Sequence, residues 1–238
     1  MSVSDRIHPL VRRHATALGL GAVLCLLSFM PGTDFHFRLL AMVCVFALAA
    51  VGLNVLMGHA GVVSLGHAGF FAIGAYSVAI GPARLGLSSW SSLAIGVALA
   101  AAIAFVIGRP ILRLKGHYLA AATLGFGILL FMVLTNEVAW TGGPDGMPVK
   151  RLQIGDLRVA GPKVWYVTAA VLLVVGVWLA ANLERSPTGR ALQAIHGSEV
   201  AASVNGVDVA RYKLVAFVVS AIYTAIAGAM LPLMDVHV

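Results

Sequence analysis

Seven runs of apolar residues, each close to the roughly 20 residues that a helix needs to cross the hydrocarbon core of a bilayer, divide this chain along its length. In lipid, backbone polar groups must find partners within the protein, and none of the runs alternates with the period of two that a barrel strand requires. Each run is therefore predicted to be a helix. The runs lie at residues 15–30, 39–57, 64–80, 92–112, 118–135, 164–183 and 214–233.

Composition agrees with a location in the bilayer. Hydrophobic residues make up 60% of the chain and charged residues only 11%, and the mean hydropathy is +0.96. Such a chain has too little polar surface to cover a soluble globule. The first run follows Arg6, Arg12 and Arg13 as a signal peptide would, but no small-residue cleavage pattern follows it, so it is kept as a span. The prediction is an all-α, polytopic transmembrane helical bundle of about seven spans, forming one domain over residues 1–238.

Basic residues indicate how the chain is oriented. The net charge of +7 is spread mainly over the ends of the apolar runs, which is typical of topological anchors and argues against a nucleic-acid partner. A cytoplasmic N-terminus places the larger share of Lys and Arg inside, including those of the long polar interval at residues 184–213. The cytoplasmic set is Arg6, Arg12, Arg13, Arg109, Arg113, Lys115, Arg185, Arg190, Arg211 and Lys213, and the outer set is Arg38, Arg84, Lys150, Arg151, Arg158 and Lys163.

No Asp, Glu, Lys or Arg lies deep inside a predicted span. Transport coupled to a proton or another ion usually needs an ionisable group at depth, so this class is disfavoured. His59 and His67 lie near the break between the second and third runs, where a hydrogen-bonded histidine and a proton relay remain alternatives. No pair has metal-ligand spacing and no catalytic set converges at membrane depth. We therefore expect no enzyme activity, metal or cofactor.

The break between the second and third runs is rich in small residues. Gly58 and Gly61 are expected to interrupt the helix, and Ser64 to cap the next one. One hypothesis is that Ser64, Gly66, His67 and Gly69 line a path through the membrane, where the positive end of the helix meets a carboxylate. The alternative is a tightly packed hairpin without a ligand. The small residues that favour close packing are Gly66, Ala68, Gly69, Ala72, Gly74 and Ala75.

The polar interval at residues 184–213 contains a helix-to-glycine segment from Glu199 to Gly206. We predict one short helix from Arg190 to Gly206, with the glycine allowing a sharp exit toward Tyr212. Its position between two spans on the predicted cytoplasmic side is typical of a docking surface for a partner. The alternative is an amphipathic helix that lies on the membrane surface.

These segments, taken in order, resemble the LivM-type permease subunits of branched-chain amino acid ABC importers. The blocks that carry the resemblance are Gly52-Leu53-Asn54, Gly58-His59-Ala60-Gly61, Ser64-Leu65-Gly66-His67-Ala68-Gly69-Phe70-Phe71, Arg113 to Tyr118, Thr123 to Phe126, Thr141 to Met147, Gly189-Arg190-Ala191-Leu192, Glu199 to Gly206, and Arg211 to Ala221. The departures include His59, where the family more often has Tyr, and Pro144, where it often has Ser.

The resemblance implies a multi-pass permease of the bacterial inner membrane that imports branched-chain or related amino acids. It implies four partners besides membrane lipid: a second permease subunit, two cytoplasmic ATP-binding subunits and a periplasmic amino-acid-binding protein. It also assigns coupling to the ATPase to Arg190, Glu199, Ala201, Ala202 and Gly206. The chain has no Gly-x-x-x-x-Gly-Lys-Ser/Thr loop, so separate subunits are expected to hydrolyse ATP.

The end of the chain departs from the family pattern. Family members usually continue beyond the run that ends here near Met230, with further spans, whereas this sequence stops at Val238. It is therefore expected to be a shortened product or an incomplete sequence that inserts without supporting uptake alone. Two other functions remain open: a permease for another small polar solute such as urea, short amides or a sugar, and a non-conducting assembly subunit.

Overall fold

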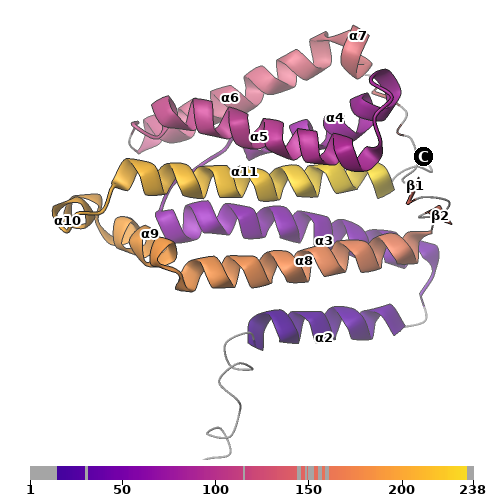
Figure 1. Ribbon diagram of the computed structural model, residues 1–238, viewed down its shortest axis with the longest axis horizontal. Helices are drawn as coiled ribbons and strands as arrows, with labels where there is room; N and C mark the ends of the chain where they lie inside the picture. Colours follow the sequence, from indigo (N-terminus) through magenta and orange to yellow (C-terminus); the bar gives the residue numbers. More distant parts are fainter. Residues whose placement is uncertain are drawn as a thin grey trace, which may run out of the picture.

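The computed structural model describes residues 15–29, 32–114, 116–143, 146–147, 149, 153–154, 157–158 and 161–234. Across these residues the fold is a bundle of helices that run side by side along the long axis of the molecule (Figure 1). The elements are α2 (Ala15–Phe29), α3 (Asp34–Asn54), the π-helix η2 (Val55–His59), α4 (His67–Arg84), α5 (Ser89–Ile111), α6 (His117–Asn136), α7 (Val138–Thr141), β1 (Gln153–Ile154), β2 (Leu157–Arg158), α8 (Pro162–Arg185), α9 (Pro187–Gly197), α10 (Glu199–Val204) and α11 (Val209–Met234).

The all-α prediction is confirmed for the described spans, with one small addition. The two-residue strands β1 and β2 pair antiparallel, with Gln153 opposite Arg158 and Ile154 opposite Leu157. Some residues used in the predictions of orientation and family resemblance lie outside the described residues. They are residues 1–14, Lys115, 144–145, 150–151 and 235–238.

Five helical segments are long and apolar enough to cross a membrane: Asp34–His59, Ser89–Ile111, His117–Asn136, Pro162–Arg185 and Val209–Met234. The other two predicted runs also form helices, but neither is among the five. Helix α2 has 15 residues and is about 22 Å long, which is short of a hydrocarbon core of about 30 Å. Helix α4 has 18 residues, and His67, Pro82 and Arg84 lower its hydropathy.

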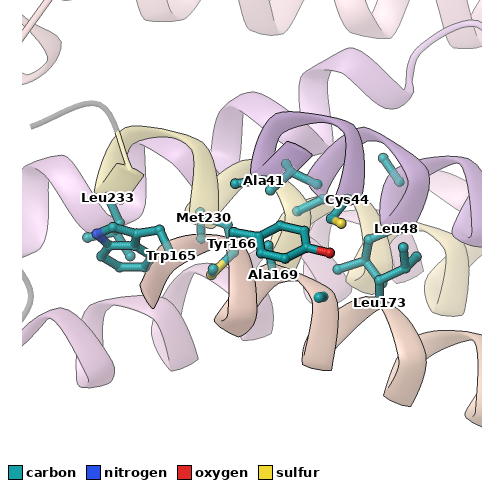
Figure 2. Packing of buried hydrophobic residues seen from close by; sticks show 14 of the residues in the cluster. Ala41, Cys44, Leu48, Trp165, Tyr166, Ala169, Leu173, Met230 and Leu233 are labelled. Atoms are coloured by element: carbon teal, nitrogen blue, oxygen red, sulfur yellow. The ribbon is translucent and has the colours of Figure 1, made fainter. Parts of the chain in front are cut away.

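Helix α11 occupies the centre of the bundle. It packs against α4, α3 and α5, and more of it is buried than of any other candidate span. In Figure 1 it lies between the layer of α3 and α8 and the layer of α4 and α5, while α2 and α6 lie on opposite outer sides. One buried cluster joins α3, α8 and the end of α11. Figure 2 shows Tyr166 of α8 at its centre, near Cys44 of α3 and Met230 of α11.

Two glycines set the distance between α4 and α11. A Cβ atom built on Gly74 would overlap the carbonyl oxygen of Ala225, and one built on Gly228 would overlap the carbonyl oxygen of Phe71. Each glycine therefore lies directly against the backbone of the other helix. The small-residue packing that the sequence predicted for the third run is confirmed at this crossing.

Two predicted helix boundaries are wrong. Gly58 does not interrupt the helix, because the chain continues from α3 into the wider turn of η2 and stays helical to Ala60, and the break begins at Gly61, as expected for that glycine, and covers residues 61–66. The segment from Arg190 to Gly206 is not one helix, because Ser198 is extended, with φ −164°, and separates α9 from α10. Its hydroxyl accepts a hydrogen bond from the Ala201 amide at 3.2 Å and so caps the second helix.

Candidate functional site

The α3–α4 connection, residues 61–66, is folded against the bundle. Gly61 has φ +66°, in the left-handed region that glycine adopts without strain. Ser64 and Gly66 are buried, and the Leu65 amide donates to the Thr123 hydroxyl of α6 at 3.0 Å. A Cβ built on Gly66 would overlap the carbonyl oxygen of Thr123. The connection is thus attached to α6 by one hydrogen bond and by direct backbone packing.

His67, the first residue of α4, joins three elements. Its Nδ1 lies 2.8 Å from the Ser64 hydroxyl, and its Nε2 lies 2.8 Å from the Ser220 hydroxyl of α11. His67 is 4% exposed, and its ring meets Phe70 and Phe217 edge to face. A neutral imidazole has one donor and one acceptor, and a serine hydroxyl complements either. Both ring nitrogens are therefore satisfied inside the protein.

This arrangement corrects the expected cap. The N-cap position of α4 is Gly66, with no side-chain hydrogen bond, and Ser64 binds the His67 ring instead. The fourth predicted path residue, Gly69, faces α6, where a Cβ would lie 2.6 Å from Cδ1 of Leu130. The structure thus brings Ser64, Gly66, His67 and Gly69 together where α4, α6 and α11 meet. Their part in a transport path stays a prediction, as does a proton role for the histidine.

Ser220→Ala tests the His67 contact between α4 and α11. It is expected to lower the free energy of unfolding by about 1 kcal/mol, because one nitrogen of a buried imidazole loses its partner. The control is Ser203→Ala, which removes an exposed local hydrogen bond to the Val200 carbonyl and should change stability by less than about 0.5 kcal/mol. Thermal unfolding of the purified protein in detergent measures both, and equal melting temperatures would contradict the role assigned to Ser220.

The α9–α10 segment, residues 187–204, lies between spans α8 and α11 at one end of the bundle (Figure 1). The Ser186 hydroxyl accepts from the Gly189 amide at 3.2 Å, and Pro187 occupies the first turn of α9. Leu192 and Ile195 of α9 are buried, whereas Val200 and Val204 of α10 are 72% and 82% exposed. Helix α10 therefore has two exposed apolar side chains on its surface, outside the bundle.

Four of the five predicted coupling residues lie on α10 or in the turn after it. Glu199 binds the buried Lys213 of α11 at 2.5 Å, Ala201 is exposed and Ala202 is buried. Gly206 lies in the turn between α10 and α11 with φ +81°, which fits the expected glycine exit. Arg190 lies apart on α9, where Nη1 donates to the Arg185 carbonyl at 3.2 Å. The structure gives these residues positions, and their coupling role remains a prediction.

The α3–α4 connection and the α9–α10 segment are in contact. Helix α9 packs against η2, and Leu192 belongs to the same buried cluster as Leu56 and Val62. A Cβ built on Gly61 would lie 3.0 Å from Nδ1 of His196. A displacement of α9 would therefore press directly on the α3–α4 connection. This contact was not predicted from the sequence, and neither were the contacts of Thr123 and Ser220 or the partner of Glu199.

Comparison with known proteins identifies relatives that share these segments. Residues 35–238 match the model of a family described as the permease component of the branched-chain amino acid transport system. The high-affinity branched-chain amino acid transport system permease protein LivM of Escherichia coli K12 is 35% identical over 210 residues, 78% of this chain and 49% of the relative.

The protein of the same name from Salmonella typhimurium LT2 is 34% identical over 213 residues, 79% of this chain and 50% of the relative. The chain thus spans about half the length of the curated relatives it matches. No solved structure matches it significantly.

Proposed function

The chain belongs to the family of permease components of the branched-chain amino acid transport system, and on this premise we propose that it is a permease subunit of an ABC importer for branched-chain or related amino acids. The observation that carries the proposal is the family match over residues 35–238, which covers the five candidate spans, apart from Asp34 at the start of the first, and the α9–α10 segment. A permease moves its substrate without changing it chemically, so the protein is not an enzyme.

The proposed partners rest on the family match, and the segment between α8 and α11 offers a surface for one of them. We assign α10 as the docking surface for an ATP-binding subunit, because Val200 and Val204 are exposed apolar side chains of the kind that interfaces cover. Motion of the docked helix would reach the bundle by two contacts. One is the ion pair from Glu199 to Lys213 in α11, and the other is the packing of His196 against Gly61. A second permease subunit and a periplasmic amino-acid-binding protein complete the proposed complex.

The proposed topology has seven membrane-embedded helices in the bacterial inner membrane, with the N-terminus and the α9–α10 segment in the cytoplasm. The support is the basic residues at the end of the bundle that carries α10, where cytoplasmic Lys and Arg are expected. The described members of that set are Arg109, Arg113, Arg185, Arg190, Arg211 and Lys213. The count of seven includes α2 and α4, which pack against the longer helices α8 and α11, respectively.

We also propose that substrate passes beside Ser64, Gly66, His67 and Gly69. Four buried polar side chains, Ser64, His67, Thr123 and Ser220, gather where α4, α6 and α11 meet. Each group is already bound inside the protein, so contact with a substrate requires movement of α4 relative to α11.

Uptake of labelled leucine by cells that lack their own system tests the function. Because the chain spans half of its relatives' length, it is compared with a fusion that carries the remaining segment of the E. coli relative, each with the relative's partner subunits. The fusion is expected to restore uptake that isoleucine and valine suppress, and the chain alone is not.

The same assay separates the alternative functions. Competition by urea or short amides instead of isoleucine would favour a permease for another small solute. A fusion that assembles with the ATP-binding subunits but takes up no tested solute would favour an assembly subunit and contradict the proposal.

A further inference from the structure

A cavity of about 790 Å³ lies between the end of α5 and the start of α11, at the same end of the bundle as α10. Its lining has two kinds of surface. Phe105, Leu112 and Leu214 supply an apolar wall. Arg109 and Arg113, from the end of α5 and the turn after it, and Arg211, from the first turn of α11, supply a basic one.

The acidic residues at this cavity already have partners. Glu199 binds Lys213, and Oδ1 of Asp208 accepts the Arg211 amide at 3.1 Å, which caps the start of α11. The Arg109 guanidinium lies over the Phe105 ring, 4.2 Å from its centroid, a cation–π contact that holds it at the wall. Within the described part of the chain, no carboxylate forms an ion pair with any of the three arginines. The cavity therefore carries an excess of positive charge.

The level of the cavity relative to the bilayer follows from helix length. Helices α5 and α11 are about 35 and 39 Å long, so their ends extend beyond a hydrocarbon core of about 30 Å. The arginines at these ends lie where phosphate groups are found, and Phe105 and Leu214 lie one to two turns toward the hydrocarbon. A ligand that suits both walls has an anionic phosphate joined to apolar chains.

We propose that this cavity binds an anionic membrane phospholipid, with its phosphodiester held by Arg113 and Arg211 beside Arg109 and its acyl chains against Phe105 and Leu214. Guanidinium groups form paired hydrogen bonds to phosphate oxygens, and basic cavities between transmembrane helices are suited to anionic head groups. A docked soluble protein could satisfy the arginines but would not cover the apolar surface next to them, where Val106 is 65% and Phe105 42% exposed on a spanning helix. Lipid contacts both surfaces.

The test uses the full chain, purified in neutral detergent and titrated with dioleoylphosphatidylglycerol or dioleoylphosphatidylcholine while native mass spectrometry counts bound lipid. The wild type is expected to retain phosphatidylglycerol at about tenfold lower lipid concentration than phosphatidylcholine. Arg113→Gln combined with Arg211→Gln is expected to weaken phosphatidylglycerol binding by about tenfold or more, at roughly fivefold for each basic group. Both side chains are exposed, so the variant should keep the melting temperature of the wild type in phosphatidylcholine.

Arg84→Gln, compared with Arg113→Gln alone, is the matched control, because each removes one positive charge from an exposed arginine and Arg84 lies at the C-terminal end of α4, away from the cavity. It should leave binding unchanged. Glycerophosphoglycerol, which has the head group without acyl chains, should fail to displace the lipid at equal concentration. Each opposite result overturns the proposal: equal retention of the two lipids, equal loss in the Arg84 variant, or displacement by the free head group. Unchanged lipid binding with lost association of the ATP-binding subunit would assign the cavity to protein docking instead.

Discussion

Replacing Gly74 or Gly228 by alanine is expected to destabilise the bundle by about 3 kcal/mol and to reduce the yield of folded protein severely. Each new Cβ would overlap a backbone carbonyl oxygen of the opposite helix, Ala225 or Phe71, and a backbone atom cannot turn aside as a flexible side chain can. Helices α4 and α11 would have to separate along their whole contact. The loss of packing would be large, because association in lipid depends on close approach rather than on a hydrophobic driving force between helices.

Gly125→Ala is the control for this prediction. Gly125 also lies inside a helix, α6, but a Cβ there would meet no atom within 4 Å. The control should fold at least as well as the wild type, since alanine favours helix over glycine. The fraction of protein that elutes as a single species after heating in detergent compares the three variants. Equal midpoints for Gly74→Ala and Gly125→Ala would show that the crossing is looser than described.

Glu199→Lys is expected to abolish transport by the fusion that carries the remaining segment of the E. coli relative, while the variant still inserts into the membrane. The change places a second ammonium group beside Lys213, whose side chain is nearly buried, so α10 should be pushed away from α11. If α10 transmits the motion of the ATP-binding subunits, stimulation of ATP hydrolysis by loaded binding protein should be lost. Glu199→Gln keeps the shape without the charge and should cause a smaller loss.

The reciprocal change gives a sharper test. Lys213→Glu alone is expected to be as harmful as Glu199→Lys, because it places two carboxylates together. The double variant restores opposite charges with exchanged positions and should recover a substantial part of the stimulation. ATPase activity of the reconstituted complex, with and without loaded binding protein, measures all three. If the double variant is no better than the singles, the ion pair does not carry the coupling.

The sequence predicted the helices well because a membrane leaves few choices for backbone that must bond to itself. Its errors lie where helix ends depend on contacts rather than composition. Helices α3 and α11 each begin five residues before the predicted apolar run, at Asp34 and Val209, because polar residues continue the helix outside the apolar stretch. The prediction of a single helix from Arg190 to Gly206 did not take Ser198 as the start of a second helix, although a serine followed by a glutamate is a common start signal.

The candidate sites were predicted as segments but not as contacts. Small residues and the polar interval marked the right places, since these are unusual in an apolar chain. The partners of His67 and Glu199 could not be found in the same way. Ser220 and Lys213 lie on α11, and only the packing of that helix against α4 and α10 brings them within hydrogen-bond distance. A single sequence gives no register between distant helices.

The central place of α11 has a consequence for synthesis of the protein on the ribosome. Ser220 follows His67 by 153 residues, and the ribosome needs between about 8 and 30 s to synthesise them at usual elongation rates. During that interval α4 has entered the membrane while the imidazole lacks its second serine and the surfaces of Gly74 and Phe71 lack the helix that covers them. The nascent bundle therefore lacks its central helix until α11 is made. Delayed arrival of α11 should leave the chain open to membrane proteases, and slowing translation between α8 and α11 is expected to shorten its lifetime.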